Sequence, residues 1–287
     1  MLAELTSSPT LDAFSAIKVR RTPNLPLVWS LEFEHGKANE VGVQVLDDLE
    51  KLTKELSAPG GPIALISFSR RSSARGTPIF IAGANVTERG DWTDDEIKRH
   101  VRRQRRILTE LRCAPVFHLC VVHGVALGWG TEFLITADYK LGTPSASFAL
   151  PETGLGILPG AGGTSELSSL IGPAHALRLG MTGERINCDE AVRVGLIQEQ
   201  HADLDQALER AVSLSKLASR NSPTALAAFK RALLNAIGLE PTQRAETEAL
   251  AYERCVSTGQ AAIGRRDFSL IRKGETPEWG PRQEPHS

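Results

Sequence analysis

The stretch VHGVALGWGTEF, from Val122 to Phe133, decides how this chain is expected to fold. It leaves an apolar run, places small residues around Trp129, and puts Glu132 in front of a second apolar run. A strand, a Gly-rich turn and the start of a helix in this order are typical of proteins whose helices connect parallel strands. Small residues at such a turn leave backbone N–H groups uncovered at the positive end of a helix. We therefore expect a site that holds a negatively charged oxygen here, with Glu132 beside it.

The order of short strand, turn and helix recurs on both sides of this stretch. Apolar runs at Val28–Phe33, Ile63–Phe68, from Ile79, and at Val116–Val122 predict buried strands. Apolar residues spaced for one helix face fill intervals between them, as at Val41–Leu56. Two further extended pieces are predicted at Tyr139–Leu141 and Ala146–Ala149. The alternation predicts an α/β protein with parallel strands.

The pattern changes after residue 203. Helical stretches at about 204–219, 223–236 and 242–257 follow one another without strand signals. We predict a loose lead-in at residues 1–16, an α/β core at 17–203 and a helical subdomain at 204–287.

The charge balance excludes a strongly basic or acidic protein. Thirty-three Lys and Arg residues face 34 Asp and Glu residues, so nothing global favours nucleic acid as a partner. The local run RRQRR, Arg102–Arg106, falls in a helical pattern, and we interpret it as a solvated helix face rather than a binding patch.

No targeting or metal-binding pattern stands out. Met1–Ala16 lacks a basic start followed by an apolar block, and no run of about 18 apolar residues occurs. The four cysteines and seven histidines show no metal-type spacing. We therefore predict a cytoplasmic protein without a membrane span, a bound metal or a separate cofactor.

Two turns are candidates for holding an oxyanion. One is Ile81–Asn85 (IAGAN), and the other is Leu127–Gly130 (LGWG). If the N–H groups of Ala84 and Trp129 converge, they form a two-donor hole. Two ordinary tight turns are the alternative. The Gly-rich segments GWGTEF and PGAGGTSE (Pro159–Glu166) fit neither a dinucleotide fingerprint nor a P-loop, so these phosphate-binding motifs are not expected.

Two glutamates accompany these turns. Glu132 lies one turn into its predicted helix, and Glu152 lies in the Gly- and Pro-rich segment LPETGLGILPGAGG. Burial in an apolar pocket raises the pKa of a glutamate toward the range of a general acid or base. Either residue alone is more often a surface charge, but together beside candidate donor turns they indicate acid–base chemistry.

The motifs IFIAGAN, VALGWGTEFLITADY, FALPETGLGILPGAGGT and LGMTGERINCDEAVRVGLI resemble the crotonase, or enoyl-CoA hydratase/isomerase, superfamily. The resemblance covers the chain from about Val19 to Trp279. It implies a crotonase-like ββα spiral core followed by a C-terminal helical trimerisation subdomain. It also implies a homotrimer or a dimer of trimers, and an acyl-CoA substrate whose coenzyme A is not a separate cofactor.

The resemblance assigns roles to individual residues. Ala84 and Trp129 match oxyanion-hole positions, and Glu132 and Glu152 match the two catalytic glutamates of the hydratases. Contacts with substrate or coenzyme A are implied for Lys37, Ala38, Ala82, Gly83, Asn85, Gly128, Pro151 and Gly160.

The reaction implied is addition of water across the α,β double bond of an enoyl-CoA, with Glu132 as base and Glu152 as proton donor. The alternatives are an enoyl-CoA double-bond isomerase or another acyl-CoA lyase of this fold, and a non-enzymatic relative that uses RRQRR for binding. Trp129 stands where many hydratases have glycine, so its indole either packs in the core or narrows the acyl pocket.

Overall fold

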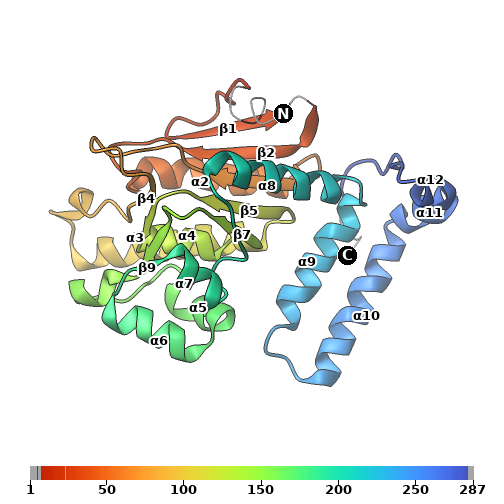
Figure 1. Ribbon diagram of the computed structural model, residues 1–287. Helices are drawn as coiled ribbons and strands as arrows, with labels where there is room; N and C mark the ends of the chain where they lie inside the picture. The colour runs from red at the N-terminus through yellow and green to blue at the C-terminus, as the bar shows by residue number, and fades with distance from the viewer. Residues whose placement is uncertain (1–4, 6–7, 23, 284–287) are drawn as a thin grey trace.

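The computed structural model describes residues 5, 8–22 and 24–283, which form two β-sheets surrounded by helices (Figure 1). The six-stranded sheet has the order β1-β2-β3-β5-β7-β10, and the four-stranded sheet has the order β4-β6-β8-β9. The strands of the larger sheet are β1 (Ile17–Thr22), β2 (Leu25–Phe33), β3 (Ala64–Phe68), β5 (Phe117–Val122), β7 (Tyr139–Gly142) and β10 (Glu199–Gln200). Those of the smaller sheet are β4 (Ile79–Ile81), β6 (Val125–Leu127), β8 (Ser147–Ala149) and β9 (Ile186–Asn187).

The chain winds through both sheets in successive turns. Each turn adds one strand to the large sheet and the next strand to the small one, so β3, β5 and β7 are neighbours, as are β4, β6 and β8. These neighbours pair in parallel, whereas β1 with β2 and β8 with β9 are antiparallel. The predicted α/β fold with parallel strands is confirmed. The separate strand β6 was not predicted, because only three residues follow the turn at Gly124 before the next turn.

Helices return the chain between the strands. In chain order they are α2 (Val43–Ser57), the 3₁₀ helix η1 (Thr87–Arg89), α3 (Asp94–Cys113), α4 (Trp129–Ile135), the 3₁₀ helix η2 (Pro151–Leu155), α5 (Gly163–Ile171), α6 (Pro173–Thr182) and α7 (Cys188–Arg193). No helix within the described residues is both long and apolar enough to cross a membrane.

The large sheet is buried on both faces. Successive side chains of a strand point to opposite faces, and neighbouring residues of β5 accordingly belong to different hydrophobic clusters. Cys120 and Val122 belong to the cluster under α2, α3 and α4, whereas Leu119 and Val121 pack in the cluster under α8 (Leu204–Ser219). This double coverage explains why the strands read as continuous apolar runs.

The C-terminal helices divide into two groups. Helix α8 packs on the large sheet, whereas α9 (Pro223–Ala236) and α10 (Pro241–Ser257) pack against each other and extend away from the body (Figure 1). Two short helices follow, α11 (Gln260–Arg266) and α12 (Phe268–Arg272). Helix α8 thus packs on the predicted core at residues 17–203, although the sequence assigned it to the helical subdomain. The boundary between core and subdomain at residue 204 stays a prediction.

The last residues of the predicted lead-in are hydrogen-bonded to helix α2. The Asp48 carboxylate accepts hydrogen bonds from the backbone N–H groups of Ser15 at 2.7 Å and Ala16 at 2.6 Å. Burial raises the pKa of Asp48, but these two bonds together with Lys51 outweigh burial, so the pKa lies below its usual value. Residues 1–4 and 6–7 of the predicted lead-in lie outside the described residues.

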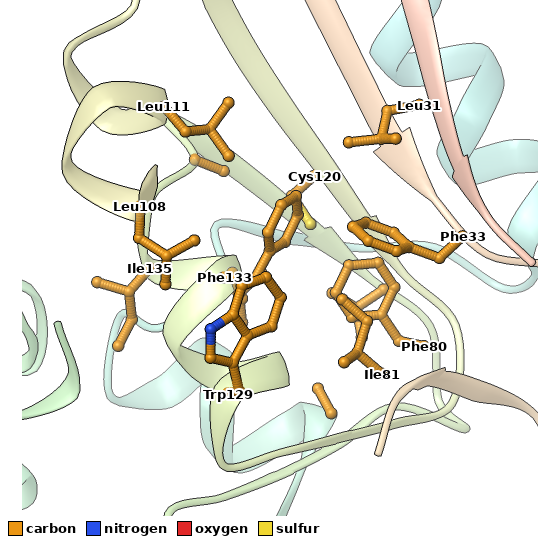
Figure 2. Packing of buried hydrophobic residues seen from close by; sticks show 14 of the residues in the cluster. Leu31, Phe33, Phe80, Ile81, Leu108, Leu111, Cys120, Trp129, Phe133 and Ile135 are labelled. Carbon is orange, nitrogen blue, oxygen red and sulfur yellow. The ribbon is translucent and has the colours of Figure 1, made fainter. Parts of the chain in front are cut away.

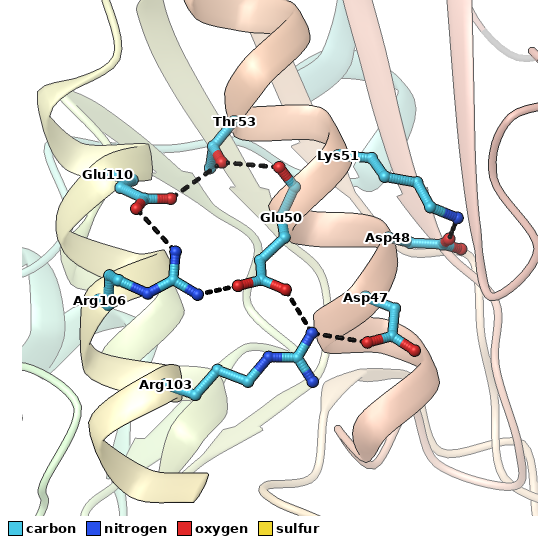
Figure 3. Close-up of polar contacts among 8 residues, drawn as sticks. All are labelled: Asp47, Asp48, Glu50, Lys51, Thr53, Arg103, Arg106 and Glu110. Atoms are coloured by element: carbon cyan, nitrogen blue, oxygen red, sulfur yellow. Dashed lines mark hydrogen bonds and ion pairs between the residues drawn. The ribbon is translucent and has the colours of Figure 1, made fainter. Parts of the chain in front are cut away.

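The RRQRR run joins α3 to α2 (Figure 3). Arg103 donates to Asp47 at 2.6 Å and also pairs with Glu50, and Arg106 pairs with Glu50 as well. This differs from the expected solvated face, because α2 presents carboxylates along the line where α3 crosses it. The expectation fits Arg102, whose side chain is exposed.

Candidate active site

One cavity of about 250 Å³ gathers most of the residues singled out in the sequence. It lies between the turn after β4, the start of α4, the helix η2 and the loop before α5. The predicted site residues that line it are Ala82, Gly83, Ala84, Gly128, Trp129, Glu132, Pro151, Glu152 and Gly160. Its volume is below the roughly 300–1,000 Å³ of pockets for drug-sized ligands, which suits a small reacting group.

The turn after β4 leaves the N–H of Ala84 uncommitted. Val41 donates to the carbonyl of Gly83 at 3.0 Å and accepts from the N–H of Asn85 at 2.9 Å. In a parallel pairing the residue between two bonded neighbours directs its own N–H to the opposite edge. Accordingly, the Ala84 N–H donates to no acceptor in the described part of the chain, and Ala84 lines the cavity.

The turn before α4 presents a second such donor. Gly128 adopts φ 50° and ψ −116°, a conformation open essentially to glycine alone. Trp129 follows as the first residue of α4, where backbone N–H groups have no partner inside the helix. Its N–H likewise donates to no acceptor among residues 5, 8–22 and 24–283.

Glu132 is held in place by the start of α5. Its side chain is 4% exposed, and Oε1 accepts hydrogen bonds from the N–H groups of Ala161 at 2.7 Å and Gly163 at 3.0 Å. Burial raises the pKa of Glu132, whereas the two N–H donors and the charge of Arg105 oppose this rise. The two donors therefore fix the carboxyl group in position and favour its ionised form, while burial still keeps the pKa above its usual value.

Glu152 reaches the same cavity from η2, a helix of five residues without a buried side chain. Its Oε2 is buried but has no hydrogen-bond partner among the described residues. Burial, together with the charge of Glu132, raises the pKa of Glu152 to about 7. A Cβ atom added at Gly128 would lie 2.5 Å from its Oε1, so glycine at that position also makes room for this carboxyl group.

The Trp129 side chain packs in the core (Figure 2). It is 2% exposed and stacks on Phe133 with a centroid distance of 5.7 Å and an interplanar angle of 30°. Of the two placements considered from the sequence, the indole takes the core, although the residue also contributes to the cavity wall. Its Nε1 has no partner in the described part of the chain.

Three predicted residues do not line the cavity. Lys37 is exposed and Ala38 is half-buried, and the carbonyl of Ala38 accepts the N–H of Ala82 at 3.1 Å. Asn85 turns its Oδ1 toward the hydroxyl of Thr87 at 2.6 Å. Lys37 and Ala38 are thus connected through Ala82 to the edge of the site rather than to its interior.

The sequence-based prediction missed polar residues of the cavity wall. Arg89 from η1 and Gln104 from α3 both line it. Gln104 falls on the same helix face as the buried Leu108 and Leu111, and that spacing is a signal that could have separated it from the arginines around it. Arg89 carries no comparable signal, because η1 is a single turn without apolar periodicity.

This arrangement permits a defined kind of chemistry. Two uncommitted backbone donors can stabilise an oxyanion, and two carboxyl groups with different environments can accept and donate protons. Loss of one oxyanion donor typically costs about 2.7–4 kcal/mol of barrier. The cavity therefore suits a carbonyl compound that passes through an enolate.

Comparisons with known proteins agree in the family they indicate. The model of the enoyl-CoA hydratase/isomerase family matches residues 74–276. YngF of Bacillus subtilis, named as an enoyl-CoA hydratase/isomerase, is 30% identical over 236 residues, which cover 82% of this chain and 88% of that protein. The short-chain-enoyl-CoA hydratase of Clostridium acetobutylicum is 27% identical over 237 residues, 83% of this chain and 88% of the relative. The crystal structure of an enoyl-CoA hydratase from Bacillus anthracis superimposes with a TM-score of 0.83 at 27% identity, covering 92% of this chain and 99% of the other.

Proposed function

Because the chain belongs to the enoyl-CoA hydratase/isomerase (crotonase) family, we propose that it adds water across the α,β double bond of an acyl-CoA thioester. The observation that carries this proposal is the shared cavity of Glu132, Glu152, Ala84 and Trp129. Two carboxyl groups can transfer the protons of such an addition, and two free N–H donors can stabilise its enolate.

In the proposed reaction the thioester carbonyl oxygen lies between the N–H groups of Ala84 and Trp129. Addition at the β-carbon moves an electron pair onto this oxygen, and the two donors stabilise the resulting enolate. Both donors belong to the backbone, so their positions depend on the turns that carry them rather than on side-chain rotamers.

The two glutamates would divide the proton transfers. Glu132 accepts a proton from water as the oxygen bonds to the β-carbon, and Glu152 gives its proton to the α-carbon as the enolate collapses. The product gains one water molecule, and a proton then passes from Glu132 to Glu152 to restore the starting state. The raised pKa of Glu152 supports its role as donor, and the N–H bonds to Glu132 support its role as base.

The coenzyme A part of the substrate is proposed to follow the edge of the site. The hydrogen bond from the N–H of Ala82 to the carbonyl of Ala38 joins two segments there, which supports the predicted contacts of Lys37, Ala38 and Ala82 with coenzyme A. Gly83, Asn85, Gly128, Pro151 and Gly160 complete the proposed binding set.

We further propose association into a trimer or a dimer of trimers. Large apolar side chains stay exposed in the single chain, among them Phe229 at 69% and Leu233 at 56% on α9. Such exposure on a protruding helix pair favours burial against another copy. A cytoplasmic location stays a prediction.

The decisive experiment compares Glu132→Gln and Glu152→Gln with Glu209→Gln, a matched change at an exposed glutamate of α8. Hydration of crotonyl-CoA is followed by loss of conjugated absorbance. Each cavity variant should lose roughly 100- to 10,000-fold in kcat, the usual contribution of general acid–base catalysis. The Glu209 variant should keep the wild-type rate.

Binding of butyryl-CoA, which cannot be hydrated, separates catalysis from substrate affinity. Both cavity variants should bind it within about threefold of the wild type. Retained rates with lost binding would overturn the assignment. Conversion of a 3-enoyl-CoA to its conjugated isomer without any hydration would instead make the protein a double-bond isomerase.

A further inference from the structure

Arg89 belongs to the cavity wall, and part of its guanidinium group has no hydrogen-bond partner among the residues that the structure describes. Arg89 ends η1, a few residues after the turn that carries Ala84. Its Nε and Nη2 atoms are buried, yet neither has a hydrogen-bond partner among the described residues. A buried donor of a charged group is costly when it is left unpaired, so a ligand that accepts from both atoms would relieve this cost.

Polar groups of α3 lie near the same part of the wall. Gln104 is 3% exposed and lines the cavity, and its Nε2 has no partner in the described part of the chain. One turn earlier, His100 is 7% exposed, packs its ring against Trp92 at 5.0 Å, and also has an unpartnered Nε2. Arg89, Gln104 and His100 thus each place at least one buried nitrogen in this region that has no hydrogen-bond partner among the described residues.

Arg89 forms no salt bridge within the described part of the chain, although the charge of Glu88 partly opposes the lowering of its pKa by burial. Glu88 adjoins it in sequence, but the Glu88 carboxylate accepts the N–H of Val43 at the start of α2, at 3.1 Å. His100 adds no negative charge, and burial together with Arg89 and Arg103 lowers its pKa to about 4. Arg103 itself is paired with carboxylates of α2.

We propose that Arg89, assisted by Gln104, binds a carboxylate carried on the acyl group of the substrate. The donors Nε–H and Nη2–H point in the same direction from one edge of the planar guanidinium and match the two oxygens of a carboxylate. This inference rests on the proposed hydratase function and narrows it to unsaturated acyl-CoA esters with a terminal carboxylate.

The position of Arg89 favours the acyl group over the phosphates of coenzyme A. Arg89 lines the cavity that holds Glu132 and Glu152, whereas Lys37 and Ala38, the proposed coenzyme A contacts, do not. Arg89 is also the one lysine or arginine among the residues that line this cavity. A third carboxylate can enter beside two glutamates only if a cation compensates its charge.

The first measurement compares carboxylated and neutral substrates. Mono-CoA thioesters of trans-2-enedioic acids with five to seven carbon atoms are matched with their ω-methyl esters, which remove the charge. Wild-type kcat/KM should favour the best carboxylated ester at least tenfold over its methyl ester. Arg89→Met should lower this ratio at least tenfold and abolish the preference, because the carboxylate loses its charge-assisted partner.

Three further variants sharpen the result. Arg89→Lys keeps the charge but not the paired donors, so its selectivity should lie between those of the wild type and Arg89→Met. Gln104→Leu should lower the ratio by a smaller factor than Arg89→Met. Arg102→Met is the control, because Arg102 is exposed on the same helix and does not line the cavity. It should leave the ratio unchanged.

A binding measurement keeps this proposal separate from the reaction. Glutaryl-CoA and pentanoyl-CoA are saturated and cannot be hydrated, and calorimetry gives their affinities directly. The wild type should bind glutaryl-CoA more tightly by about tenfold, and Arg89→Met should lose this preference.

This binding preference without any hydration of enoyl-CoA would refute the hydratase and retain the carboxylate site. No wild-type preference for either carboxylated set, or an equal loss for charged and neutral esters in Arg89→Met, would overturn the carboxylate site. The equal loss would assign Arg89 to the coenzyme A phosphates.

Discussion

Glu132 and Glu152 face one cavity, but the protein holds their carboxyl groups in different ways. Glu132 lies in an α-helix with all seven residues buried, and two N–H groups from the start of α5 bond to its Oε1. Glu152 lies in a 3₁₀ helix without a buried residue, and its Oε2 has no partner in the described part of the chain. Hydrogen bonds anchor the carboxyl group of Glu132, whereas the position of the Glu152 carboxyl group depends mainly on the space that Gly128 leaves for it.

Because their surroundings differ, two side chains of the same type can perform two different chemical tasks. Donors that bond to a carboxylate favour its ionised form, whereas burial without donors favours the protonated form. The pKa of both residues is raised by burial, but only Glu132 has N–H groups of other residues that oppose the rise. The surroundings thus predispose Glu132 to accept a proton and Glu152 to supply one.

Of the predictions that test this difference between the two glutamates, the largest effect is expected from closing the space around Glu152. Gly128→Ala should reduce kcat for crotonyl-CoA by at least about 100-fold, comparable to the loss of an oxyanion donor. The new Cβ would lie 2.5 Å from Oε1 of Glu152, and φ 50° with ψ −116° is strained for alanine. The Trp129 N–H follows directly and would move with the turn. Steady-state hydration kinetics measure this effect.

Gly76→Ala is the matched control for backbone strain. Gly76 also has a positive φ, 79°, but an added Cβ would meet nothing within 4 Å. This variant should keep at least half of the wild-type kcat. A fully active Gly128→Ala enzyme would show that Glu152 does not need its present position.

The second prediction concerns the dependence of the rate on pH. Because the pKa of Glu152 is raised to about 7, the group is mostly protonated below pH 7 and loses its proton above it. If Glu152 donates a proton, kcat/KM for crotonyl-CoA should fall about tenfold per pH unit above this pKa. The limb at lower pH should reflect protonation of Glu132, the proposed base. Rates between pH 5 and pH 9 test both limbs.

Glu152→Gln should remove the alkaline limb from whatever rate remains. The two carboxyl groups interact, so the measured pKa values belong to the pair rather than to single residues. A rate that increases steadily up to pH 9 would contradict the role of Glu152 as proton donor.

Much of the fold was predictable because its signals are local. Apolar runs such as Ile63–Phe68 and Val116–Val122 were predicted as strands, and the structure has β3 at Ala64–Phe68 and β5 at Phe117–Val122. The helix predicted to begin near Trp129 is α4. The gathering of Ala84, Trp129, Glu132 and Glu152 at one cavity was also anticipated, although through the family resemblance rather than through spacing.

Other features depend on contacts between distant segments and left no local signal. The N–H groups that bond to Glu132 come from residues 29 and 31 positions further along the chain. Arg103 was interpreted as part of a solvated face, because its partner Asp47 lies 56 residues away. The single-turn helix of Arg89 has no periodicity that would place its side chain.

The smallest predicted effect isolates the anchoring bonds themselves. Glutamine keeps an oxygen that can accept from Ala161 and Gly163, whereas leucine of similar size does not. Glu132→Leu should therefore be less stable than Glu132→Gln by about 1–3 kcal/mol, the cost of unsatisfied buried donors. At Glu152 the same two substitutions should differ by less than about 0.5 kcal/mol, since no bond to another residue is lost. Urea unfolding at pH 7.5 measures the free energy of unfolding of all four variants. None of them carries the charge of the replaced carboxylate, so this charge does not affect the comparison. Equal differences at the two positions would mean that the N–H groups of Ala161 and Gly163 do not anchor Glu132, and the distinction between a fixed base and a freer acid would fail.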